Sequence, residues 1–151
     1  MLTSGQQSVL VSAINADQTL TALAAANGFP QIADAMNAAS SPAVSVWRAD
    51  LPSKTVLNAL QASDMPSPAG LIGYVQLLLS VPVIDASNAN VRASFSTCFS
   101  GKTTLANLTG LAQRTATRFE ALFTTVASPA NTTSVYGYLV TADDVQAALG
   151  K

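Results

Sequence analysis

The sequence feature that most limits the fold of this chain is a run of apolar and small residues at helical spacing in its second half. These residues recur every three or four positions, which places them on one face of an α-helix. The run consists of Leu105, Leu108, Leu111, Ala112, Thr115, Phe119, Leu122 and Val126. With Thr103 or Thr104 capping its first turn, the spacing predicts one long helix over 103–126. The fold should therefore be organised by the packing of helices.

Shorter helices are expected upstream, each bounded by capping residues, proline or glycine. Thr3 or Ser4 can cap the first helix, Asp17 can cap the second, and Pro30 can open a third. Further helices are expected at about 53–61, 69–79 and 88–99, the last of them ended by Gly101. The first hundred residues thus alternate short helices with turns.

Two segments are expected to be extended chain. Residues 43–47 alternate small or polar with apolar side chains up to Trp47, and residues 134–140 are interpreted as a short strand before a helix capped at Thr141. A lone strand leaves its backbone groups unpaired. The tail strand should therefore pair with 43–47 or add to a strand of a neighbouring chain.

The expected fold class is mainly α, a single-domain helical bundle over 1–151 with one or two short strands or extended segments. Its C-terminal extension, from about 127–151, should contain a loop, a short strand and a short helix. Hydrophobic residues occupy 49% of the 151 positions, which is enough to fill one core.

The low content of charged residues bears on function. Charged residues make up 10% of the chain, against about 25% in an average domain, and the formal net charge is -1. Such a surface offers little electrostatic barrier to association, which favours self-assembly or a tight partner; a monomer with a low-charge surface is the alternative. Seven basic residues offset by eight acidic ones, with no basic run, argue against nucleic acid as the main ligand.

The residues that most enzymes need are missing from this sequence. The chain has no histidine, which removes Ser-His-Asp and Cys-His arrangements, and Cys98 is its single cysteine. Glu120 stands alone, and most of the aspartates fall at expected helix caps. The sequence Gly101-Lys102-Thr103 resembles the end of a phosphate-binding loop, but Ser96 stands where that motif needs a glycine. We therefore predict no enzyme and no catalytic, cofactor-binding or metal-binding residues.

No membrane association is expected. The longest apolar stretch, 71–84, is short and is interrupted by polar residues and Pro82. The first ten residues lack the basic and apolar regions of a signal peptide, so synthesis in the cytoplasm is the expectation.

Two groups of residues are candidates for contacts with other molecules. Trp47 and Arg48 form the first group, and Trp47 either anchors a subunit interface or is buried in its own core. The expected tail strand adds Val135, Tyr136 and Tyr138 as subunit-interface candidates.

Arg114 and Arg118, one turn apart on the expected long helix, form a second kind of candidate. A solvated helix face is one interpretation of such a pair. Contact with DNA phosphates in the lumen of a ring, or with a partner's carboxylate, is the other.

Three stretches resemble, in order and spacing, a group of small proteins of tailed bacteriophages and prophages that are encoded among the virion structure genes. They are Ser41-Pro-Ala-Val-Ser-Val-Trp47-Arg48, Asn88-Ala-Asn90-Val91-Arg92-Ala93 continuing to Phe99-Ser100-Gly101, and Arg114-x-Ala-x-Arg118-x-Glu120-x-Leu122-Phe123. The resemblance covers most of the chain from about Asp34 onward. The chain departs from the group at 124–128, where a glycine-rich loop is expected.

The resemblance implies a bacteriophage virion structural protein similar to head-to-tail adaptors. Its partners would be further copies of itself in a ring, the portal protein, and a tail or neck protein, with non-specific contact to packaged DNA. Its location would be the neck of the virion, after synthesis in the bacterial cytoplasm. The alternatives are another virion component, either a capsid decoration or a tail protein, and a non-virion phage protein that binds a host factor.

Overall fold

A computed structural model describes residues 1–67, 69–124 and 135–151. Most of these residues are helical, which confirms the mainly α fold class. Their contacts group them into two compact units. Within the described residues, the first unit consists of 1–44, 115–124 and 135–151, and the second consists of 45–67 and 69–114.

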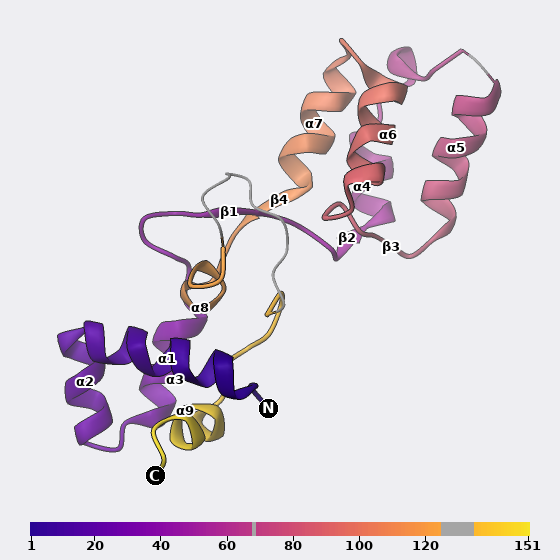
Figure 1. Ribbon diagram of the computed structural model, residues 1–151. Coiled ribbons are helices and arrows are strands. Elements are labelled where there is room, and N and C mark those ends of the chain that lie inside the picture. Colours follow the sequence, from indigo (N-terminus) through magenta and orange to yellow (C-terminus); the bar gives the residue numbers. More distant parts are fainter. Residues whose placement is uncertain (68, 125–134) are drawn as a thin grey trace. The chain divides into compact units, whose positions relative to one another are not determined.

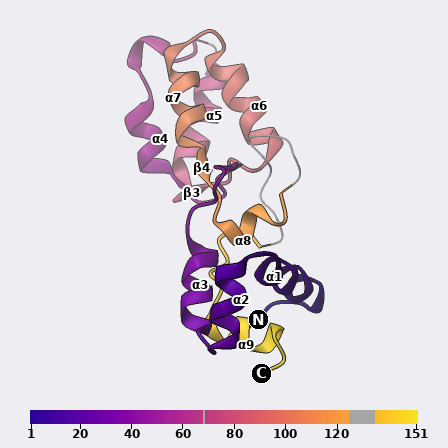
Figure 2. The same ribbon diagram turned by 90° about the vertical axis from the view of Figure 1, so that its left-hand side faces the viewer.

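The first unit is a bundle of short helices. Its elements are α1 (Ser4–Ala16), α2 (Gln18–Ala25), α3 (Phe29–Asn37), α8 (Arg118–Ala121) and α9 (Ala142–Ala148). Figures 1 and 2 show α1, α2, α3 and α9 side by side, with α9 against both α1 and α3. The chain's last helix thus packs on its first.

Three helices of the first unit, α1, α2 and α9, begin where capping side chains predict. The Thr3 hydroxyl accepts the Gln6 backbone N–H, and the Gln6 side chain accepts the Thr3 N–H, which completes a capping box. Asp17 caps α2, and Thr141 caps α9. These three predicted caps are confirmed.

Phe119 lies in the hydrophobic core of the first unit. Its ring is fully buried, 5.2 Å from the Phe123 ring in an edge-on arrangement and 6.4 Å from the Tyr138 ring. Aromatic rings prefer such tilted contacts to face-to-face stacking. The other fully buried large apolar side chains of this core are Leu10, Ile14, Leu20, Ile32, Met36, Val135 and Val145.

The second unit combines helices with two small sheets. Its elements are β1 (Ser45–Trp47), β2 (Leu51–Pro52), α4 (Ser53–Ala59), the 3-10 helix η1 (Ala62–Asp64), α5 (Ala69–Ser80), β3 (Val83–Ile84), α6 (Ala89–Phe99), α7 (Thr103–Leu111) and β4 (Gln113–Thr115). Strand β1 pairs with β4, and β2 pairs antiparallel with β3, which places Leu51 opposite Ile84. Helix α4 contacts α5 and α7, and α6 contacts α7. Gly101 follows α6 with a φ of +69°, as expected of a residue that ends a helix.

The predicted long helix over 103–126 is wrong. Helix α7 ends at Leu111, and α8 begins only at Arg118. Between them the backbone is extended and bonds to the segment before and within β1: the Ala116 N–H donates to the Val44 carbonyl at 2.8 Å. Sheet-like pairing therefore replaces helical hydrogen bonds between α7 and α8. Val126, the last residue of the predicted helical run, lies outside the described residues.

The predicted tail strand is wrong over 135–140, the part of it that the structure describes. These residues form a turn and irregular chain. Val140 is held by a side chain, because its N–H donates to Asn37 Oδ1 and its carbonyl accepts from Asn37 Nδ2, both at 2.8 Å. The partner of β1 is therefore β4 and not the tail, and the expected loop of the extension lies largely outside the described residues.

The buried residues form two hydrophobic clusters where the sequence suggested one core. Leu108 belongs to the cluster of the second unit, together with Val56, Phe95 and Phe99. Phe119, which shares the helical period of Leu108 in the sequence, belongs to the cluster of the first unit. The break after α7 accounts for this division. Whether residues 1–151 fold as a single domain stays a prediction.

Phe119→Ala should lower the free energy of unfolding by about 3–5 kcal/mol, because it leaves a cavity among buried side chains that cannot close around it. Leu122→Ala is the matched control, since Leu122 is 37% exposed and its truncation should cost about 1 kcal/mol or less. Urea unfolding followed by circular dichroism measures both. Equal losses in the two variants would contradict the placement of Phe119 at the core.

Candidate functional site

Trp47, the chain's single tryptophan, lies at the end of β1 with its indole half-buried. The guanidinium of Arg92 on α6 lies over this ring, with Cζ 4.8 Å from the ring centroid, which is within cation–π range. Arg92 Nη1 also donates to the carbonyls of Ala86, at 2.9 Å, and Ser87, at 2.5 Å. The guanidinium is therefore held in place over the indole, and together they form a rigid surface.

A hollow of about 240 Å³ lies beside this pair. We call it the Trp47 hollow, and it is lined by Trp47, Arg92, Ala93, Phe95, Ser96, Leu105, Thr109 and Ala112. Its lining comes from β1, α6 and α7 and from Ala112, just after α7, so the fold of the second unit creates it. Its volume is below the roughly 300–1,000 Å³ typical of small-molecule sites. Its size suits an inserted side chain.

Arg48, the second predicted interface residue, is engaged beside Trp47. Its Nε donates to Asp50 Oδ1 at 3.0 Å in an ion pair whose carboxylate is mostly exposed. Exposed pairs of this kind stabilise a fold by about 1 kcal/mol or less. The pair fixes the position of the Arg48 side chain next to Trp47 more than it stabilises the unit.

The predicted interface residues of the tail pack on their own unit. Val135 is 2% exposed and belongs to the core of the first unit, so its side chain does not reach the surface. Tyr136 and Tyr138 are half-buried. Leu139, which the sequence did not single out, is the exposed apolar residue here, with 64% of its surface accessible. No local signal marks Leu139, because its exposure depends on contacts made by residues far along the chain.

Asp144 is a buried carboxylate that joins the tail to the N-terminus of the chain. One of its oxygens accepts from the Tyr138 hydroxyl at 2.7 Å and from the Thr141 N–H and hydroxyl at 3.0 and 2.8 Å. The other accepts the Leu2 N–H at 3.4 Å. Burial raises the pKa of Asp144, but the hydrogen bonds from Tyr138 and Thr141 outweigh it and hold the pKa below its usual value. Burial and the neighbouring carboxylate raise the pKa of Tyr138 to about 12.

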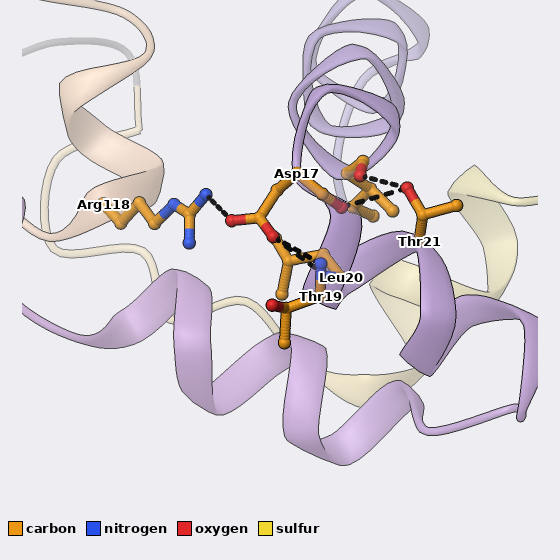
Figure 3. A network of polar contacts seen from close by, with 6 residues as sticks. Asp17, Thr19, Leu20, Thr21 and Arg118 are labelled. Carbon is orange, nitrogen blue, oxygen red and sulfur yellow. Dashed lines mark hydrogen bonds and ion pairs between the residues drawn. The ribbon is translucent and has the colours of Figure 1, made fainter.

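Arg118 pairs with an acid of its own unit, as Figure 3 shows. Its Nη2 donates to Asp17 Oδ2 at 2.7 Å, while Asp17 Oδ1 accepts the Thr19 and Leu20 N–H groups at the start of α2. The Arg118 hydrogen bond is the main cause that lowers the pKa of Asp17, followed by the Leu20 N–H. Arg118 thus braces α8 against the start of α2.

Arg114 lies in β4, so the predicted placement of both arginines on one helix face is wrong. The cause is the same break in the expected long helix. Arg114 belongs to the second unit and Arg118 to the first. Contact of either one with DNA stays a prediction.

The segment that resembles a phosphate-binding loop is occupied by the chain's own carboxylate. Asp64 Oδ2 accepts the Thr104 N–H at 2.9 Å in the first turn of α7, and the Thr104 hydroxyl accepts the Gln61 N–H at 3.1 Å. The Thr104 N–H lowers the pKa of Asp64. The carboxylate thus takes the position that an anion would occupy at this helix end.

The described residues contain neither a candidate metal-binding group nor a helix that could cross a membrane. Residues 1–67, 69–124 and 135–151 contain no group of three or more acidic, cysteine or histidine side chains that could hold a metal ion. In the same part of the chain, no helix has the length and apolar character needed to cross a membrane.

Comparison with known proteins finds no matching family model, no matching curated protein and no matching solved structure.

Asp144→Asn should lower the free energy of unfolding at pH 7 by about 1–3 kcal/mol, because an amide NH₂ would face donors that now meet a carboxylate. The pKa of Asp144 is depressed by folding, so its stabilising effect is present above the unfolded pKa of about 4 and is lost as pH falls through the folded pKa. The stability gap between wild type and variant should therefore narrow from pH 7 to about pH 3 in urea titrations. A gap that stays constant or widens would contradict the role given to the carboxylate.

Asp17→Ala should cost about 0.5–2 kcal/mol, because it removes the cap of α2. Arg118→Gln should cost about 1 kcal/mol or less, because the ion pair that it removes is partly exposed and screened by water. Thermal unfolding of the two variants and of the double variant measures both losses and their coupling. Because Asp17→Ala removes both the cap and the ion pair, a loss for Arg118→Gln as large as that for Asp17→Ala would contradict the role given to the cap.

Proposed function

We propose that this chain is a structural subunit of a tailed-bacteriophage particle, a head-to-tail adaptor that forms a ring between the portal and the tail. The observation that carries the proposal is a set of large apolar side chains exposed on the second unit, three of them in a stretch of sequence without charge. Such a surface is suited to being covered by another protein.

The exposed apolar residues belong to neighbouring elements of the second unit. Leu57 on α4, Leu77 on α5, Val81 and Val83 are between 41% and 64% exposed. Residues 69–84, which include α5 and β3, contain no charged side chain. Single exposed leucines are common in soluble proteins, but an apolar helix with no charge along its length has little to keep it from associating.

The roles of the acidic side chains also favour assembly over acid–base catalysis. Asp17, Asp64 and Asp144 each accept backbone N–H groups. Glu120, which is 2% exposed, accepts the N–H groups of Thr117 and Gly137. These carboxylates hold helix starts and turns, so their positions are set by the fold.

The choice of a phage particle rests on the resemblance carried by three stretches of the chain. Two of these stretches meet in the second unit, because Trp47 comes from the first and Arg92 from the second. On this proposal the subunits form a closed ring, contact the portal protein and a tail or neck protein, and are located in the neck of the virion.

Gradient-purified particles of the phage or prophage that encodes the chain should contain it when analysed by mass spectrometry. Its copy number should match that of the portal ring and stay far below that of the major capsid protein, because an adaptor ring occupies one vertex. Absence from the particles would overturn the proposal and favour the host-factor alternative. A copy number close to that of the capsid protein would identify a decoration protein instead.

Leu77→Asp tests the apolar surface in the same particles. It places a charge on the exposed face of α5 and should reduce the amount of the chain per particle by about tenfold or more, if that face contacts another virion protein. Gln76→Asp is the matched control, since Gln76 is the neighbouring exposed residue on α5 and is already polar. Equal incorporation of the two variants would remove the surface from the proposal.

A further inference from the structure

We propose that Leu139 of one copy inserts into the Trp47 hollow of a second copy, so that copies of the chain bind head to tail. This interface rests on the assembly role proposed above and specifies the surfaces that carry it. Leu139 belongs to the first unit and the Trp47 hollow to the second, so each copy offers one of each.

Leu139 is held rigidly on the surface of the first unit. The residue before it, Tyr138, is anchored through its hydroxyl to Asp144 at 2.7 Å. The residue after it, Val140, has both its N–H and its carbonyl bonded to the side chain of Asn37 at 2.8 Å. An apolar side chain that is 64% exposed between two anchored neighbours loses little conformational freedom on binding. This preorganisation distinguishes Leu139 from an ordinary exposed leucine.

The Trp47 hollow has the size and lining to receive such a side chain. Its floor includes Phe95 and Ala112, which are almost fully buried, and its wall includes the indole fixed under Arg92. At about 240 Å³ it has room for a few side-chain groups but is small for a cofactor. Tryptophan and arginine beside an apolar pocket are the residues most enriched at the centres of protein interfaces.

The formal charges of the two units are complementary, which favours a second copy as the occupant. The first unit carries five acidic and two basic side chains, a formal net charge of -3. The second carries five basic and three acidic side chains, a formal net charge of +2. A contact between the first unit of one copy and the second unit of the next brings together surfaces of opposite net charge. A contact between two first units or two second units would bring together net charges of the same sign, which repel.

A contact between two different surfaces is heterologous, so it leaves one Leu139 and one hollow free at the ends of every open assembly. Repetition of such a contact closes into a ring if the rotation between copies allows it. The ring of the proposed adaptor thus follows from one repeated contact.

Trp47 provides a direct reporter, because it is the only tryptophan and lines the hollow. As the wild-type concentration rises, its emission should shift to shorter wavelength together with an increase in mass in sedimentation velocity. Leu139→Asp should raise the concentration needed for both changes by about tenfold or more. Met65→Asp is the control, because Met65 is also an exposed apolar residue of the second unit, at 38%, but lies outside the hollow lining; it should leave both changes within about twofold.

A mixing experiment tests the head-to-tail geometry. Thr109→Arg fills the hollow from an exposed position in its lining and should block association when present alone. A mixture of Thr109→Arg and Leu139→Asp chains retains one intact Leu139 and one intact hollow per pair, so it should form complexes of two chains and no larger ones. Circular dichroism of each variant checks that it is folded.

Three results of these association and fluorescence experiments would overturn the proposed interface. The first is that wild-type chains stay monomeric, with unchanged Trp47 emission, up to about 1 mM. That concentration populates even a weak contact, so the proposed contact would then be absent. Association that Met65→Asp disrupts and Leu139→Asp leaves intact would also overturn the interface. So would a shift in Trp47 emission that does not depend on concentration. These results leave the adaptor proposal standing if the chain is still found in particles, whereas absence from particles removes that proposal on separate grounds.

Discussion

The extended pairing of residues around Ala116 is the interaction on which the rest of the structure depends. In the first unit Ala116 donates to Val44 and accepts from Ser40, and in the second unit Arg48 donates to Ala112. These bonds end one helix at Leu111 and allow another to start after Thr117. Without them, Leu108 and Phe119 would lie on one helix face. With them, each side chain fills a different core, and Trp47 is held beside α6 and α7.

Local signals predicted the starts of α1, α2 and α9, because the interactions that make them span three or four residues. The cap expected from Thr103 or Thr104 is wrong, since α7 begins after Lys102 without a side-chain cap. The caps at Thr3, Asp17 and Thr141 are all present as expected. The same kind of signal was available at Thr117-x-x-Glu120, where the structure has a complete capping box. The cap at Thr117 was not predicted, because the apolar periodicity across 105–126 indicated one continuous helix. A capping pattern within a periodic run thus deserves as much weight as the period itself.

Features that depend on distant residues were not predictable from local patterns. The tail is held by Asn37, which lies 103 positions before the Val140 that it binds. An amide side chain thus takes the place of the strand partner expected for the tail. Trp47 is a candidate from the sequence because tryptophans are enriched at interface hot spots. Its partner Arg92 and the exposure of Leu139 follow from tertiary contacts, which explains why the sequence pointed to Val135 and the tyrosines instead.

In the described residues, no fully buried side-chain nitrogen or oxygen lacks a partner. The assembly role proposed for the chain is based on its exposed apolar side chains and on the tryptophan surface fixed by Arg92. A cryo-EM map of the portal–tail junction is the most direct test. The account predicts a ring of these chains at the junction, with Leu139 of each copy in the Trp47 hollow of its neighbour. A junction whose density is fully explained by other proteins would contradict it.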